Sequence, residues 1–129
     1  MNKELLKSLL EKEGLGEIDE INYKKEFYIV DSFYEFDKVE VDAAIMYAND
    51  GCGEDRDDEW FEEFYSTYLF DIAADNLEEV IDEICEKHKL FADITLCEIE
   101  RKAMNKVEVI VVFSEKEFDI EKVIDEIEQ

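Results

Sequence analysis

Apolar residues recur at helical spacing at the start of the chain and predict a first helix between Asn2 and Gly14. Asn2 is a favoured N-cap residue, and Gly14 stands where a helix is often terminated by a residue in the left-handed conformation. Between them the apolar positions fall at i, i+1, i+4 and i+5, the spacing of one helical face: Leu5, Leu6, Leu9 and Leu10.

The period changes between residues 24 and 47. Phe27, Ile29 and Phe33 belong to an aromatic, β-rich run. After it, apolar residues alternate with Glu40 and Asp42 at the period of a strand: Val39, Val41, Ala43, Ile45 and Tyr47. The pattern predicts a β-hairpin that turns near Asp37.

A short repeat predicts a second hairpin. The tetrad Lys38-Val39-Glu40-Val41 returns 68 residues later as Lys106-Val107-Glu108-Val109, with Asn105 in the place of Asp37. Asp and Asn both tolerate the left-handed conformation of a tight turn. We therefore expect strands near 92–101 and 106–113. Four matching letters fit either internal duplication or chance, and the hairpin does not depend on the choice.

The central segment carries paired apolar positions every four residues from Trp60 to Ala73, and the stripe continues to Cys85. A four-residue repeat drifts by about 40° per step on a straight helix, so a break is needed, and Asn76 with Glu79 offers a capping pair. The pattern predicts helices over 58–74 and 77–89, with a strand as the alternative for 64–70. A last helix is predicted over about 118–128.

These elements give the order α-ββ-αα-ββ-α. The order favours a single α+β domain over 1–129, in which an antiparallel sheet of two hairpins has helices packed on one face.

Charge changes the picture more than any motif. The chain has 38 acidic and 14 basic residues and a net charge of -24. Leu, Ile, Val and Phe together account for 40 of its 129 residues, which is enough to bury a core, so we expect a folded domain with an acidic surface. Such a surface repels phosphate and disfavours direct binding to nucleic acid or to an anionic membrane.

Other features indicate a cytoplasmic protein of a bacterial host cell. The N-terminus lacks the unbroken apolar run of a signal peptide, and no run of 18 apolar residues occurs. Three cysteines without tight spacing suggest no disulfide framework and fit a reducing compartment. The absence of proline and the excess of Lys over Arg are typical of a low-GC bacterium or its phage.

Candidate chemistry is weak at each position. Cys52 lies between glycines and the only histidine is His88, but neighbouring carboxylates are expected to raise the thiol pKa. Cys85, His88 and Cys97 match no zinc spacing closely. The acidic loop 50–59 fits no EF-hand register, which leaves at most weak, nonspecific cation binding. We therefore expect no enzymatic activity, no metal site and no cofactor.

The negative charge is concentrated in the middle of the chain. Residues 50–86 contain 15 acidic residues and one basic residue, Arg56. Within this segment seven carboxylates fall in 16 residues, which on a helix is roughly one charge per 3.4 Å, the spacing of phosphates along one strand of B-DNA. Ordinary surface helices intersperse Lys to avoid like-charge repulsion, so this pattern favours a cationic partner over a merely solvated face.

In its acid excess, its small size and the cluster Asp57-Asp58-Glu59-Trp60-Phe61-Glu62-Glu63, the chain resembles the nucleic-acid-mimicking inhibitors that phages make against restriction and CRISPR nucleases. The resemblance is one of class and composition and rests on the central third of the chain. It implies an anti-CRISPR or anti-restriction type of inhibitor that occupies the basic groove of a nuclease, with Trp60, Phe61 or Tyr65 as apolar anchors.

The predicted partner-binding residues lie in the acidic loop, in the aromatic cluster and along the following helical segment. They are Asp55, Asp57, Asp58, Glu59, Trp60, Glu62, Glu63, Asp75, Glu79, Asp82, Glu83 and Glu86. The expected partner is a basic protein surface of a nuclease or other nucleic-acid-binding effector. Two alternatives stay open: a small housekeeping or regulatory domain that acts by self-association or partner binding, and an enzyme that depends on a cysteine or a metal.

Overall fold

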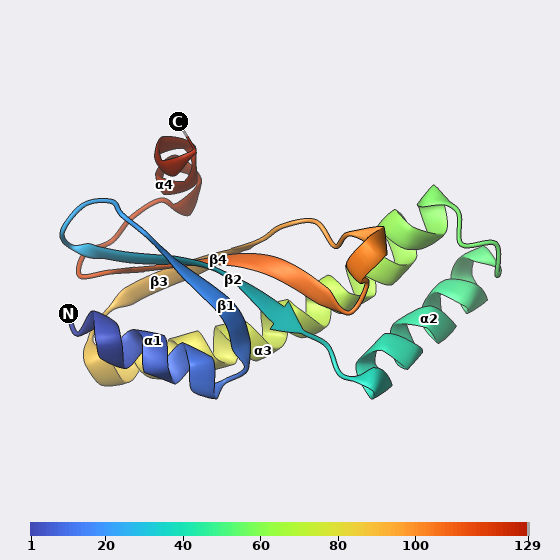
Figure 1. The fold of residues 1–129 in the computed structure, drawn as a ribbon, viewed down its shortest axis with the longest axis horizontal. Helices are drawn as coiled ribbons and strands as arrows, with labels where there is room; N and C mark the ends of the chain where they lie inside the picture. Colours follow the sequence, from blue (N-terminus) through green and yellow to red (C-terminus); the bar gives the residue numbers. More distant parts are fainter. Residues whose placement is uncertain (129) are drawn as a thin grey trace.

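The computed structural model describes residues 1–128 and confirms the α+β class. Four antiparallel strands form one sheet in the order β1-β2-β4-β3. Along the chain the elements are α1 (Lys3–Lys12), β1 (Leu15–Ile21), β2 (Phe27–Glu35), α2 (Lys38–Cys52), a π-helix (Trp60–Tyr65), α3 (Ser66–His88), β3 (Phe91–Leu96), a 3₁₀ turn (Arg101–Ala103), β4 (Lys106–Ser114) and α4 (Ile120–Ile127) (Figure 1).

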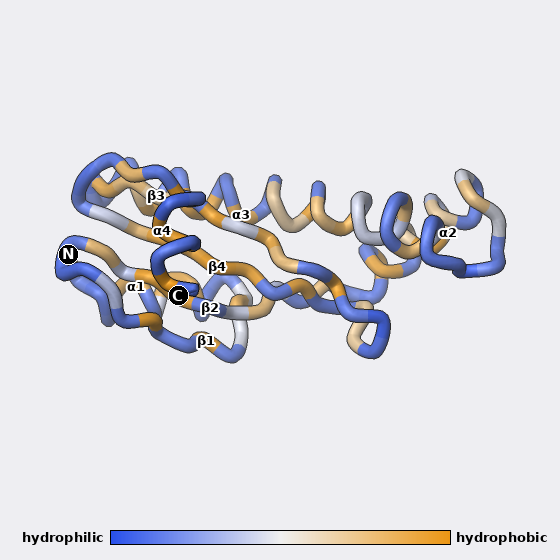
Figure 2. Tube along the Cα trace, turned by 90° about the horizontal axis from the view of Figure 1, so that it is seen from above, coloured by the Kyte–Doolittle hydropathy of each residue, from blue (hydrophilic) through white to orange (hydrophobic). Residues whose placement is uncertain are grey.

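The two central strands bury both of their faces. Alternate residues of β2 and β4, such as Val30 and Val111, pack with α1 and α3 on one face. Their neighbours Ile29 and Val112 pack with Val123 of α4 on the other face. Because both faces are covered, β2 and β4 are mostly apolar along their length (Figure 2). The prediction that the helices pack on one face of the sheet is therefore correct for α1 and α3 and wrong for the short α4, which lies on the opposite face.

A second core lies beyond the end of the sheet, where α2 packs against the π-helix and the first turns of α3 (Figure 1). Ala44 and Ala48 of α2 are fully buried, and these small side chains let the helices approach closely. At Gly51 the packing leaves no room for a side chain, since an added Cβ would lie 2.4 Å from Cε1 of Phe64. We call this part of the molecule the tip.

The first predicted hairpin is displaced along the sequence. β1 pairs with β2 from Leu15↔Tyr34 to Ile21↔Ile29, and residues 38–47, predicted as its second strand, are helical. Asp37 is the N-cap of α2: its side chain accepts the Glu40 N–H at 2.8 Å, and Glu40 Oε1 accepts the Asp37 N–H at 3.0 Å. This capping box and the buried alanines favour a helix over the local alternation.

The sequence repeat therefore has no structural counterpart. Residues 38–41 begin a helix, whereas residues 106–109 lie in the central strand β4. The second predicted hairpin is present, because β3 pairs with β4 antiparallel and the chain turns at Asn105, but β3 ends at Leu96, so the connection is longer than predicted and contains a 3₁₀ turn. Tertiary pairing on both sides of β4 decides its conformation, since the same four residue types occur in both elements.

The break predicted at Asn76 is wrong as well. α3 is continuous from Ser66 to His88, and Asn76 lies inside it, where its side-chain amide donates to the Tyr34 hydroxyl at 2.7 Å. The drift of the apolar stripe is absorbed earlier, by the wider turn of the π-helix, in which the Ser66 N–H donates to the Phe61 carbonyl. Residues 64–70 are accordingly helical, and the strand alternative is excluded.

Both terminal helices were predicted correctly. The Asn2 side chain accepts the Leu5 N–H at 3.0 Å, and Gly14 has a φ of 97° just after α1. In α4, Asp119 caps the N-terminus by accepting the Glu121 N–H at 3.0 Å. These ends are set by local hydrogen bonds, which a sequence pattern can reveal.

Candidate interaction surface

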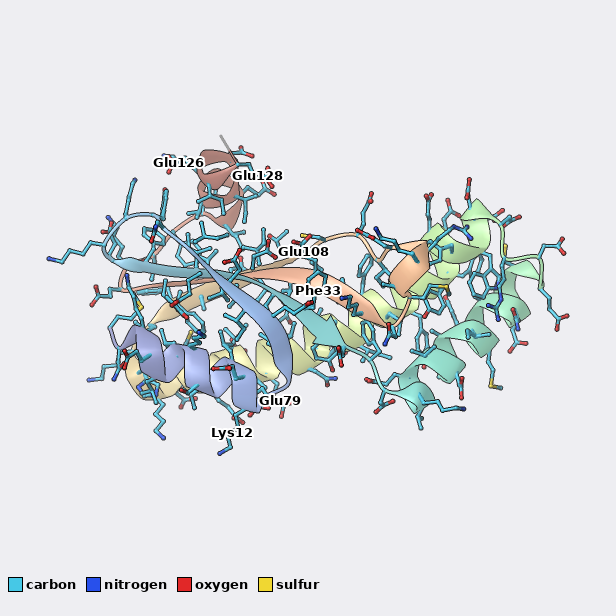
Figure 3. The ribbon with its side chains drawn as sticks, in the orientation of Figure 1. Lys12, Phe33, Glu79, Glu108, Glu126 and Glu128 are labelled. Atoms are coloured by element: carbon cyan, nitrogen blue, oxygen red, sulfur yellow. The ribbon has the colours of Figure 1, made fainter. Side chains whose placement is uncertain are left out.

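Seven carboxylates form one stripe along α3, and all seven side chains are exposed. At about 100° per residue they fall within an arc of about 140° around the helix, opposite the buried residues Leu77, Ile81 and Ile84. Glu79 lies at the outer edge of α3 in Figure 3. The stripe consists of Asp71, Asp75, Glu78, Glu79, Asp82, Glu83 and Glu86.

The stripe has no compensating cations. Seven ion pairs join residues within 1–128, and none of them includes a carboxylate of α3. Basic residues appear in α3 only at its last turn, with Lys87 and His88. Because the helix is continuous, Asp75, Glu79, Asp82 and Glu86 follow one another at i, i+4, i+7 and i+11 and make a straight line of about 16 Å.

The acidic residues of the tip form a separate group with internal partners. All of Asp55, Asp57, Asp58 and Glu59 are exposed, as are Glu62 and Glu63 of the π-helix. Asp57 Oδ1 nevertheless accepts the Trp60 N–H at 2.9 Å, and Asp58 pairs with Arg101 at 3.2 Å. The Arg101 guanidinium also donates to the carbonyls of Arg56 and Asp57, so it fastens the loop to the connection between β3 and β4.

The predicted aromatic anchors are core residues. Trp60 is 1% exposed and its indole N–H donates to Asn49 Oδ1 at 3.0 Å. Tyr65 is fully buried, its ring stacks on both Trp60 and Phe61, and its hydroxyl donates to the Met104 carbonyl. Trp60 is therefore corrected from a contact residue to a residue that holds α2 against the π-helix.

The exposed apolar side chains lie elsewhere at the tip, on α2. Val39 is 77% exposed, Met46 66% and Tyr47 47%, and on a helix these positions share one face. The strand predicted for residues 38–47 gave no sign of this surface, because in that strand Val39 and Tyr47 point to the buried side. A helical reading of the same residues, started by the capping box at Asp37, is the signal that finds it.

The structure separates the candidate nucleophile from its base. Cys52 lies at the tip, and partial burial together with the carboxylates of Glu59 and Asp57 raises its thiol pKa, as expected. His88 ends α3, about 33 Å along the helix from Ser66. A raised pKa reduces the thiolate fraction, and the distance removes His88 as its base.

The three candidate zinc ligands also fail to converge. Cys85 packs with the core under α1 and α3, whereas Cys97 packs on the opposite face of the sheet beside α4. Within residues 1–128 no group of three or more His, Cys, Asp or Glu side chains is placed to hold a metal ion. None of the helices in that range combines the length and the apolar character that crossing a bilayer requires.

The predicted contact residues thus fall into two groups on different elements: the partly engaged acids of the tip and the uncompensated stripe of α3. The stripe is the stronger candidate surface, because its charges are unpaired and regularly spaced. Comparison with family models, with curated proteins and with solved structures gave no match to this chain.

Proposed function

We propose that this protein binds the basic, nucleic-acid-binding groove of another protein and inhibits it by taking the place of the nucleic acid. The observation that carries the proposal is the stripe of unpaired carboxylates on α3. A groove that binds phosphates presents Lys and Arg side chains, and a rigid line of carboxylates at a similar linear density offers those side chains equivalent partners.

The electrostatics determine how this binding behaves. A net charge of -24 attracts a cationic surface from a distance and speeds the encounter. The attraction falls off within about 8 Å at physiological ionic strength, so affinity depends strongly on salt. The same charge disfavours self-association through the stripe and direct contact with nucleic acid.

The test compares the wild type, a stripe variant and a control variant. Each is immobilised on a support and incubated with a lysate of a low-GC bacterium. The stripe variant carries Asp75→Asn, Glu79→Gln, Asp82→Asn and Glu86→Gln. The control variant removes the same number of charges from exposed positions away from the stripe, with Glu4→Gln, Glu117→Gln, Glu121→Gln and Asp125→Asn. Bound proteins are eluted with a salt gradient and identified by mass spectrometry.

We expect the wild type and the control variant to retain a nucleic-acid-binding enzyme that the stripe variant does not retain. DNA or RNA should displace this enzyme from the wild type. The purified enzyme should then be inhibited by the wild-type protein at about one-to-one stoichiometry. Recovery of only abundant basic proteins, in equal amounts on all three forms, would contradict the proposal.

The exposed face of α2 favours a second candidate function, in which the protein is a regulatory domain that acts by self-association. Val39 and Met46 give this face apolar side chains that are mostly exposed, and Tyr47 beside them is about half exposed. An association through them would persist at about 1 M salt, where exposed charges are screened within about 3 Å. Sedimentation at low and high salt separates the two: a dimer that Met46→Ser abolishes would favour this candidate.

A further inference from the structure

A groove lies between the start of α3 and the connection from β3 to β4. Its volume is about 690 Å³, within the range of sites that bind small molecules or peptide side chains. The groove is open because the chain leaves the sheet after Leu96 and passes beside α3 without a strand to fill the space. The lining residues that matter for its chemistry are Phe61, Glu62, Phe70, Glu98, Ile99 and Arg101.

The floor of the groove is apolar and rigid. Phe61 and Ile99 are 6% and 4% exposed, so each presents only one edge to the groove while the rest of its side chain packs in the core of the tip. Phe70 is half-buried and forms a wall that an occupant can contact. The stacking of Phe61 on Tyr65 fixes the floor without an occupant.

The two cations at the rim are already engaged. Arg101 lies over the Phe61 ring with its guanidinium carbon 4.7 Å from the ring centroid, and it pairs with Asp58 and two backbone carbonyls. Lys102 pairs with Glu100 at 3.2 Å. The rim carboxylates of Glu62 and Glu98 have no cationic partner within residues 1–128.

These features give the groove an apolar interior with uncompensated negative charge at its opening. A free anion is disfavoured, because the cations are neutralised and the rest of the tip is acidic. An apolar ligand without charge gains nothing from Glu62 and Glu98. The complementary occupant combines an apolar or aromatic group with flanking positive charges.

We propose that this groove is a docking site for a basic peptide segment of a partner protein, with an aromatic side chain against Phe70 and the exposed edge of Phe61 and with flanking Lys or Arg residues at Glu62 and Glu98. The groove lies on the flank of α3 that faces the connection, apart from the centre of the acidic stripe. The inference therefore goes beyond the proposed function and stands on different residues.

The test uses two synthetic peptides, one with a tryptophan between two pairs of lysines and one with serine in its place. Binding to the full chain is measured by fluorescence anisotropy. The tryptophan peptide is expected to bind at least about tenfold more tightly, because it buries an aromatic side chain. Phe70→Ser should bring the two affinities together, and Glu62→Gln with Glu98→Gln should weaken both peptides.

Two controls separate this proposal from general charge attraction. Met46→Ser removes an exposed apolar side chain from α2 and should leave the preference for tryptophan unchanged, as should the four substitutions of the stripe variant. If Phe70→Ser disturbs the fold, amide chemical shifts of the wild type give the same information: titration with the tryptophan peptide should shift Phe61, Phe70 and Ile99.

Equal binding of the two peptides by the wild type, or shifts confined to residues outside the groove, would overturn the docking site. Neither result would bear on the proposed function, which the stripe variant tests separately. Loss of an enzyme partner from the stripe variant with an unchanged tryptophan preference would support both proposals.

Discussion

Asp31 lies on the face of the sheet that α4 covers only in part, among other carboxylates. It pairs in register with Asp19 of β1, and Glu108 of β4, labelled in Figure 3, lies diagonally across from it. Burial raises the pKa of Asp31 to about 6, and a hydrogen bond and charge repulsion from Glu108 act in the same direction. The protonated form is therefore favoured by the folded state.

The first prediction concerns the pH dependence of stability. The folded pKa of Asp31 lies above its ordinary value of 3.8. The stability that the protonated carboxyl contributes to the folded state is therefore fully present below pH 3.8 and is lost as the pH rises through about 6. Relative to the wild type, Asp31→Asn should therefore have a higher free energy of unfolding at pH 7 than at pH 4. The difference between the two pH values should be on the order of 1 kcal/mol after solvent screening. Denaturant unfolding of the wild type and the variant at both pH values measures this difference.

The control for this substitution is Asp93→Asn, which removes an exposed carboxylate from the same face of the sheet. The change that it causes in the free energy of unfolding, measured at pH 4 and pH 7, gives the baseline for removing one carboxylate from this face. If Asp31→Asn behaves as Asp93→Asn does, burial of Asp31 does not favour its protonated form in the folded protein.

α2 shows how two local hydrogen bonds can favour a helix over a strand. Residues 38–47 alternate as a strand does, yet the capping box of Asp37 and Glu40 begins a helix there. Ala44, Ala48 and Gly51 then let this helix pack closely on the π-helix. The helix in turn covers Trp60 and Tyr65, so the N-cap supports the whole core of the tip.

The second prediction is that Asp37→Ala destabilises the protein by about 1 kcal/mol, because the Glu40 N–H loses its acceptor. Asp37→Asn keeps an acceptor oxygen and should cost less. Thermal unfolding followed by circular dichroism at 222 nm measures both, with Asp119→Ala at α4 as a comparison cap. Equal stability of the Ala and Asn variants would show that the capping box does not anchor α2.

The distribution of charge dominates the molecule as a whole. The carboxylates of α3 repel one another at i, i+3 and i+4 with no cation between them, and each such pair costs a few tenths of a kcal/mol. The apolar contacts of α3 with both cores offset this repulsion. The stripe is therefore a surface of mutually repelling charges, and a cationic partner would relieve this repulsion.

The third prediction follows from this repulsion. Raising the ionic strength from about 0.01 M to about 1 M should increase the unfolding temperature of the wild type, because screening weakens the repulsion. The four substitutions of the stripe variant should raise the unfolding temperature at low salt and reduce its dependence on salt. The control variant has the same net charge, so an identical response of the two variants would show that only total charge matters.

Much of the fold could be predicted where the signal is local. The ends of α1 and α4 are set by Asn2, Gly14 and Asp119, whose hydrogen bonds and backbone conformation depend on neighbouring residues alone. The α+β class followed from the order of periodicities, and the exposed acids of α3 followed from their place opposite an apolar stripe. Charge and amphipathic spacing are properties of the chain itself.

Tertiary structure decided the conformation and the burial of residues whose local pattern fits more than one structure. The tetrad of residues 38–41 is helical behind the capping box of Asp37, whereas the tetrad of residues 106–109 is a strand because paired strands flank it on both sides. The burial of Trp60 required α2 to lie across it, and the groove beside Phe70 required the long connection after Leu96. The sequence by itself determined the acidic surface and the capped helices, while packing between distant segments determined which aromatic side chains a partner can reach.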